Sequence, residues 1–247
     1  MIAYPSLSDI QKSFEAQKSI KISIMKKSIS IYSLLLFIVP VVTLTVCHQF
    51  HVAHTGIQTI PFIDGKVSVR LIGSQEYRII IFKPAFFLYA FISVLFYFKI
   101  SNLFLKNGIK NKFKIYGVIA NFFLCIYIIA LGQKDSSFYE VLRRLAIIFY
   151  ITNMYINHIY LIKILRSLQS NKIIKFNIIY LPVFYMIIAL MTILIIIGLP
   201  WVNPLFKYPD QLKNIVEWNY FLLMIVFYIP LSLLFYQLGD KIKTFKF

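Results

Sequence analysis

The sequence predicts an all-α, polytopic membrane protein with six transmembrane helices, and two observations lead to this fold class. Hydrophobic residues make up 60% of the 247 residues and charged residues only 14%, which leaves too little polar surface for a water-soluble domain of this size. The apolar residues also form long unbroken runs, a pattern typical of helices and not of barrel strands. Lipid accepts such apolar faces when each helix satisfies its own backbone hydrogen bonds.

Six apolar segments are long enough to cross a bilayer, which takes ~20 residues of helix. The start of the second segment is the least well defined, because Lys83 and Pro84 lie there. Lys83 is expected to extend to the interface, and Pro84 suits the first turn of a helix. The predicted spans are Ile31–Phe50, Phe82–Ile100, Phe113–Leu131, Leu145–Leu165, Ile178–Leu199 and Trp218–Leu238.

Lysine and arginine residues predict the orientation of the helices. Sixteen of the 26 fall on one side of the spans, and by the positive-inside rule this side, which includes both termini, is cytosolic. The predicted organisation is a basic cytosolic tail (residues 1–30), a transmembrane domain (31–238) and a second cytosolic tail (239–247). For the first tail, an interfacial amphipathic helix and a disordered segment are both open. The one long loop, residues 51–81, is lumenal, and its apolar residues are expected to pack on the bundle or enter the interface.

The formal charge of +17 does not indicate nucleic acid as a partner, because the basic residues flank apolar runs and line no groove. His48, His51 and His54 are spaced by three residues and would cover a ~120° arc of a helix. Such a cluster suits zinc or proton transfer, but the adjoining Cys47 lies inside an apolar run and no paired carboxylate completes the cluster nearby. We therefore predict no metal site and no cofactor.

Asn157 and His158 lie inside the fourth predicted span, together with Asn153. Polar side chains in a membrane helix are costly and usually face the interior of the bundle. We expect these residues to join neighbouring helices by hydrogen bonds.

Acidic residues gather on the predicted lumenal side, which holds six of the nine. Several lie just before a predicted helix, where a carboxylate in the first turn favours the helix dipole. A functional interpretation is also open: with nearby arginines they form a pocket for a phospholipid or glycophospholipid headgroup, because the guanidinium group suits phosphate. The residues of this hypothetical pocket are Tyr77, Arg78, Asp135, Glu140, Arg143 and Glu217.

Three stretches on the same side carry a resemblance to a known family. The first begins with His54-Thr55-Gly56-Ile57 and ends with Tyr77-Arg78. The second runs from Asp135-Ser136-Ser137 to Glu140, and the third is Ile215-Val216-Glu217-Trp218. Together with the six-helix order and the long first lumenal loop, they resemble the FRAG/DRAM/Sfk family of six-helix membrane proteins, and within it the branch of post-GPI-attachment-to-proteins factor two.

The chain departs from the family's pattern at several positions. Thr55 replaces the usual cysteine, and Leu142 stands where the family has a histidine. Met224 and Tyr228 replace an Asn and His pair in the last helix.

The resemblance implies a multispanning protein of the Golgi or endoplasmic reticulum that takes part in fatty-acid remodelling of glycosylphosphatidylinositol (GPI) anchors after attachment to protein. Expected partners are membrane lipids, GPI-anchored proteins and other membrane proteins. Participation in acyl transfer to lyso-GPI is open, and no catalytic motif is evident. The alternative is a non-enzymatic regulator of autophagy or lipid asymmetry, in the lysosomal or plasma membrane. The candidate lipid- or headgroup-binding residues are His54, Tyr77, Arg78, Asp135, Glu140 and Glu217.

Overall fold

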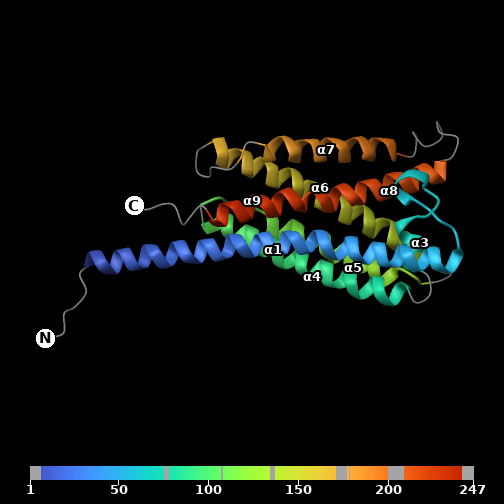
Figure 1. Cartoon of the computed structure of the whole chain (residues 1–247), viewed down its shortest axis with the longest axis horizontal. Coiled ribbons are helices and arrows are strands. Elements are labelled where there is room, and N and C mark those ends of the chain that lie inside the picture. The colour runs from blue at the N-terminus through green and yellow to red at the C-terminus, as the bar shows by residue number, and fades with distance from the viewer. Residues whose placement is uncertain are drawn as a thin grey trace.

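The chain forms a bundle of helices, with no strand among the residues that the structure describes. This structure is a computed structural model. Six stretches of helix are long and apolar enough to cross a membrane, which confirms the prediction of a multi-pass helical membrane protein (Figure 1). Of residues 7–23, 239 and 240 only the backbone is described. The described residues are 7–74, 78–106, 108–133, 137–170, 177, 179–199 and 209–240.

Seven long helices build the six spans, because the last span consists of two helices in line. Two short helices, α2 (Pro61–Asp64) and α3 (Val69–Ser74), lie between the first and second spans. The long helices are α1 (Leu7–Thr55), α4 (Arg78–Lys106), α5 (Phe113–Ala130), α6 (Ser137–Ser170), α7 (Tyr180–Ile197), α8 (Pro209–Val226) and α9 (Tyr228–Asp240).

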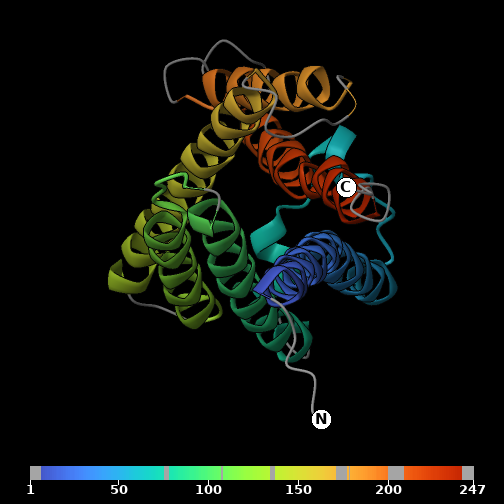
Figure 2. The same ribbon diagram turned by 90° about the vertical axis from the view of Figure 1, so that its left-hand side faces the viewer.

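The spans follow one another around the bundle. Helix α1 packs on α4, α4 on α5, α5 on α6, α6 on α7 and α7 on α8, and α9 closes the arrangement against α1 (Figure 2). Their outward faces carry exposed apolar side chains such as Phe91, Phe122 and Ile193, which suit contact with lipid. Six crossings bring the end of α9 back to the end of the bundle from which α1 enters (Figure 1).

Helix α1 shows no boundary between a tail and a first span at residue 30. It begins at Leu7 and has 49 residues, a length of ~74 Å at 1.5 Å per residue, whereas a hydrocarbon core is ~30 Å thick. Residues 7–30 contain no glycine or proline that would interrupt a helix. The part that qualifies as a span is Ile24–Thr55, and α1 ends where Gly56 adopts a positive φ of 67°.

The second span begins earlier than predicted, and Pro84 is not in its first turn. Helix α4 starts at Arg78 and has Pro84 in its interior. A proline deprives the carbonyl four residues earlier, here that of Ile80, of its helical donor, and this loss falls within the first turn of α4. Lys83 donates a hydrogen bond to the Ile129 carbonyl near the end of α5, at 3.4 Å. The predicted loop 51–81 is therefore shorter at both ends, and it contains α2 and α3.

The sixth span also begins earlier than predicted, at Pro209, and is interrupted at Phe227. Pro230 has no N–H, so the Val226 carbonyl loses its helical donor at this point. The interruption lies in the core, where Phe227 and Tyr228 are fully buried.

A glycine allows α4 and α5 to approach closely. A Cβ atom at Gly117 would lie 2.5 Å from Cγ of Tyr97. Tyr97 in turn shares a hydrogen bond with Tyr228 of α9, with 3.2 Å between the hydroxyl oxygens. One turn beyond Gly117, Asn121 donates to Ser93 of α4 at 2.9 Å. The contact between α4 and α5 therefore depends on the small residue at position 117.

We predict that Gly117→Val lowers the stability of the protein by about 1–3 kcal/mol, because the added side chain overlaps the Tyr97 ring. Thermal unfolding of the detergent-purified protein measures the effect. Val118→Leu also adds bulk to α5, but at a side chain that is 42% exposed, and serves as the control. Equal melting temperatures for wild type and Gly117→Val would contradict the close approach.

Candidate lipid-binding site

The segment between the first two spans is held by polar side chains of α8. We call residues 56–74, which carry α2 and α3, the connecting segment. Asn214 donates to the Gly65 carbonyl at 2.7 Å, the Trp218 indole donates to the Val67 carbonyl at 2.8 Å, and Asn219 donates to the Phe62 carbonyl at 2.9 Å. Backbone carbonyls in an apolar environment need hydrogen-bond donors. The side chains of α8 therefore provide the hydrogen bonds that water provides to a loop on a protein surface.

Glu217 takes part in the same attachment. The backbone N–H groups of Val69 and Arg70 donate hydrogen bonds to its carboxylate, so Glu217 caps the start of α3 from the neighbouring helix. Ser68 assists by accepting a hydrogen bond from the Leu71 N–H at 3.1 Å. The expectation that Glu217 precedes the sixth helix is wrong, because α8 begins at Pro209. Its carboxylate satisfies the donors of α3, not those of its own helix.

A cavity of about 700 Å³ lies between α8 and helices α4 to α7. Its wall is mostly apolar, with contributions from α4, α5, α6 and α7, and α3 supplies Val69. On α8 the lining residues follow the helix inward from Lys213 through Val216 and Glu217 to Tyr220 and Phe221. The cavity therefore has a charged end and a longer apolar part.

The charged end contains both cations and anions. Lys213 and Glu217 line the cavity, and Tyr127, which also lines it, lies within electrostatic range of Glu217, Arg70 and Arg143. The Arg143 side chain is buried and donates to the Ala130 carbonyl at 3.4 Å. Of these basic residues, Arg70 acts electrostatically on Glu217, Lys213 forms an ion pair with Asp210 at 3.3 Å, and Arg143 also lies within electrostatic range of Glu140.

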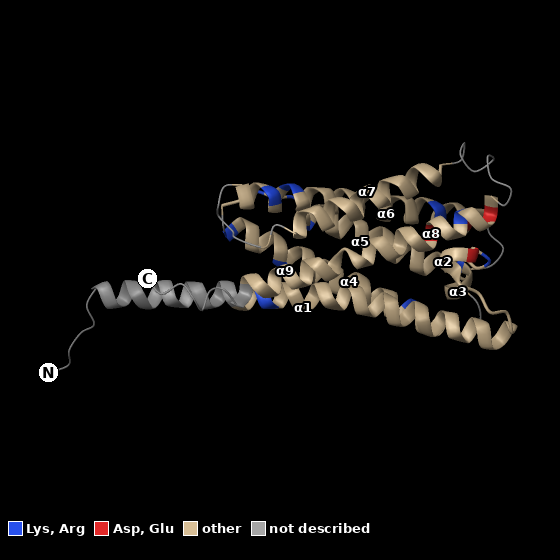
Figure 3. Cartoon of the chain, turned by 45° about the horizontal axis from the view of Figure 1, so that its top comes forward, with Lys and Arg blue, Asp and Glu red and all other residues tan. Residues whose placement is uncertain are grey.

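Carboxylates as a class lie at this end of the bundle. The Asp and Glu residues whose side chains the structure describes gather beside α2, α3 and the start of α8, whereas Lys and Arg occur at both ends (Figure 3). Glu140 lies in the first turn of α6, as predicted, and forms an ion pair with Arg144.

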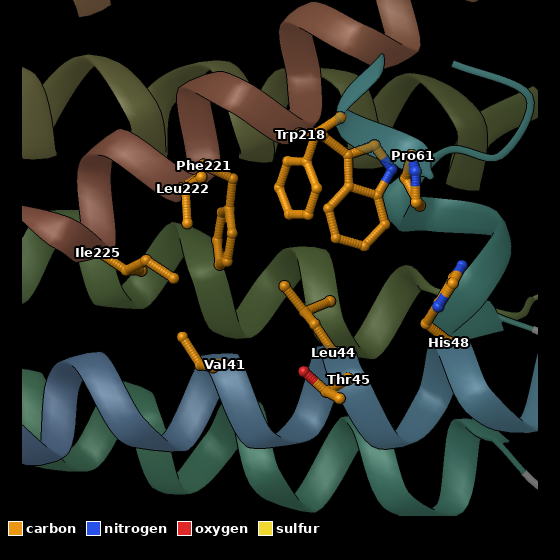
Figure 4. A pocket seen from close by; sticks show the side chains of 10 residues that line it. Val41, Leu44, Thr45, His48, Pro61, Trp218, Phe221, Leu222 and Ile225 are labelled. Atoms are coloured by element: carbon orange, nitrogen blue, oxygen red, sulfur yellow. The ribbon is translucent and has the colours of Figure 1, made fainter. Parts of the chain in front are cut away.

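A second pocket, of about 240 Å³, lies on the other side of α8. Figure 4 shows Trp218 and Phe221 of α8 facing Val41 and Leu44 of α1, with Pro61 of α2 closing one side. Phe221 lines both the pocket and the larger cavity. The aromatic wall of α8 therefore separates two apolar spaces.

The apolar residues of the connecting segment pack on the bundle in part. Val67 and Val69 are buried, and the Phe62 ring meets the Trp218 ring edge to face, with 5.2 Å between centroids. Ile60 and Ile63 remain exposed. Of these five apolar residues, Phe62, Val67 and Val69 therefore pack on the bundle, whereas Ile60 and Ile63 do not.

Arg78 does not line the cavity. It is buried and donates a hydrogen bond to Nδ1 of His51 at 2.7 Å, so it joins α4 to α1. His48 shares a hydrogen bond with Thr59 at 3.0 Å, and His54 is exposed at the end of α1. In the described part of the chain, no group of three or more His, Cys, Asp or Glu side chains is arranged to hold a metal ion.

Two of the predicted site residues, Tyr77 and Asp135, lie outside the described residues. Of the others, only Glu217 lines the cavity. Sequence reasoning missed Arg70, Tyr127, Lys213 and Tyr220. Arg70 and Lys213 were missed because helix α3 and the early start of α8 were not expected. Tyr127 and Tyr220 lie in predicted spans, where the sequence does not show which face of an apolar helix turns inward.

Asn157 and His158 face the interior, as expected, but do not join helices by hydrogen bonds. Both are buried, and neither side chain has a hydrogen-bond partner among the described residues. The His158 ring stacks on Phe227 at the interruption of the last span, with 4.0 Å between centroids. Asn153 is half-buried and donates to the Phe149 carbonyl of its own helix.

Comparison of the chain with protein-family models, with curated proteins and with solved structures gives no match. The functional argument below therefore depends on the geometry of the cavity and on the motifs in the sequence.

We predict that Glu217→Ala destabilises the protein by about 1–2 kcal/mol, because two backbone donors of α3 lose their acceptor. Hydrogen exchange at the amides of Val69 and Arg70 should accelerate. Glu140→Ala removes an ion pair of partly exposed side chains and should change stability by less than about 0.5 kcal/mol. Unchanged exchange at Val69 in the Glu217 variant would disprove the cap.

We also predict that Asn157→Leu stabilises the protein by about 1–3 kcal/mol, because a buried amide without partners is replaced by an apolar group. Thermal unfolding in detergent measures this, and Asn153→Leu provides the control, because the half-buried Asn153 amide already has a hydrogen-bond partner. A lower melting temperature for the Asn157 variant would show that the amide is needed for folding.

Proposed function

We propose that this protein is a multispanning protein of the Golgi or endoplasmic reticulum membrane that supports fatty-acid remodelling of GPI anchors by holding the lipid part of the anchor in the α4–α8 cavity. The observation that carries the proposal is the cavity itself, which combines a long apolar part with a charged end.

The size and lining of the cavity suit an acyl chain. Its volume of about 700 Å³ lies within the range of ~300–1,000 Å³ that is usual for ligand pockets. Two of its lining residues, Ile148 of α6 and Ile195 of α7, are also exposed on the outside of the bundle. A chain that enters between these helices stays in contact with apolar surface throughout, so no part of it crosses water.

The charged end suits a phosphate-containing headgroup. Arg70, Arg143 and Lys213 provide positive charge, and arginine binds phosphate through two parallel N–H donors. Because Glu217 already accepts two backbone hydrogen bonds, its negative charge is partly compensated. Lys213 also pairs with the exposed Asp210, so the buried Arg143 and the neighbouring Arg70 are the groups proposed to bind an anionic headgroup.

The proposed orientation follows from the distribution of basic residues, which favours a cytosolic location for both termini. The connecting segment and the charged end of the cavity then face the lumen, the side on which GPI-anchored proteins reside. The motif around Glu217, the best match to the FRAG/DRAM/Sfk pattern, lies at this end. The proposal assigns lipid binding to the chain and names no catalytic residue.

A non-enzymatic membrane regulator is the second candidate, and one observation favours it. Glu217, the acid of the best-matched motif, caps α3. Its carboxylate therefore has a structural role, and its presence in the motif does not require a catalytic one. In this case the cavity binds a lipid without supporting remodelling, and the acyl composition of GPI anchors does not depend on the protein.

We predict that deletion of the gene lowers the level of surface GPI-anchored proteins and changes the acyl composition of their anchors. Ile148→Trp, which fills the entrance to the cavity, should not restore either property. Ile159→Trp, three turns along the same face of α6, should restore both, because Ile159 is similarly exposed but does not line the cavity. Anchor mass spectrometry and flow cytometry provide the readouts.

Two results would contradict the proposal. Unchanged anchor lipids in the deletion strain would remove the remodelling role and favour the regulator. Full rescue by Ile148→Trp, at expression equal to that of Ile159→Trp, would show that the cavity is not needed.

A further inference from the structure

Tyr220 has a hydroxyl group that the protein leaves unused. The side chain is 5% exposed and lines the cavity. Its oxygen is buried and has no hydrogen-bond partner among the described residues. A buried hydroxyl without a partner costs free energy, and native proteins rarely keep one without a reason.

The other tyrosines of the inner cavity wall are different. The Tyr155 hydroxyl shares a hydrogen bond with Thr192 of α7, and the Tyr150 hydroxyl donates to Tyr89 at 3.3 Å. All three tyrosines line the same space. Among these three, Tyr220 is therefore the tyrosine whose O–H group is not bonded within the described part of the protein.

The position of Tyr220 along α8 shows which part of a lipid it would meet. It follows Glu217 by three residues, so it lies ~4.5 Å further along the helix axis, away from the charged end. Beyond it the wall continues with the apolar Phe221. In a glycerophospholipid, the ester carbonyls lie at this boundary between the phosphate and the hydrocarbon chains.

We propose that the Tyr220 hydroxyl donates a hydrogen bond to the ester carbonyl of a lipid chain in the α4–α8 cavity, and that the site thereby prefers ester-linked to ether-linked lipids. This inference rests on the lipid binding proposed above. An ether-linked chain has the same shape but no carbonyl, so binding it leaves the hydroxyl without a partner. Sites built around one hydrogen bond discriminate against analogues that lack it.

The test uses the full-length protein purified in detergent and two probes, dioleoyl-phosphatidylinositol with ester-linked chains and its di-O-oleyl ether counterpart. Wild type should bind the ester about three- to tenfold more tightly, the ratio that one net hydrogen bond provides. Tyr220→Phe should bind both probes equally. Tyr155→Phe, which makes the same change at a hydroxyl already bonded within the protein, should keep the preference.

A second measurement separates ligand recognition from a structural role. Without added lipid, Tyr220→Phe should melt about 2–4 °C higher than wild type, because it removes a buried polar group without a partner. A purely structural role for the hydroxyl predicts a lower melting temperature and an unchanged preference, and that result would overturn the inference.

The outcomes distinguish this inference from the proposed function. If wild type binds both probes equally, and Ile148→Trp abolishes the binding, the inference fails while lipid binding in the cavity stands. If wild type binds neither probe, the proposed lipid binding fails and the inference fails with it.

Discussion

The attachment of the connecting segment to α8 is the interaction on which the rest of the structure depends. The segment carries backbone N–H and C=O groups to the end of the bundle that also holds the charged residues, and those that are buried there would be costly without a partner. Side chains spaced along one side of α8 provide those partners, and they require α8 to continue well past the predicted start of the last span. The four side chains are Asn214, Glu217, Trp218 and Asn219.

This attachment also shapes both cavities. Trp218 and Phe62 are part of the smaller pocket because the connecting segment is drawn against α8. Val69 lines the larger cavity for the same reason. The segment brings Arg70 within electrostatic range of Tyr127 and Glu217. One set of hydrogen bonds therefore stabilises the end of the bundle and assembles the charged end of the proposed lipid site.

The hydroxyl of Tyr220 and the amide of Asn157 illustrate two kinds of buried polar group. Both lack a hydrogen-bond partner among the described residues, but only Tyr220 lines a cavity. A ligand in the cavity would lie beside the tyrosine, as proposed above, whereas Asn157 lines neither of the two cavities described. Burial alone therefore does not identify a functional residue, and an adjoining cavity is needed as well.

The sequence by itself determined the six membrane spans, since long apolar runs leave a membrane helix as the conformation that satisfies every backbone group. It also indicated Glu217 as a residue of interest. It did not determine where α4 and α8 begin, because contacts to distant residues hold the first part of each helix, as between Arg78 and His51 and between Asn214 and Gly65. Only the tertiary structure decided that Arg78 belongs to the α1–α4 contact and that Tyr220 lines the cavity, because the face of a nearly all-apolar helix that turns inward depends on its neighbours.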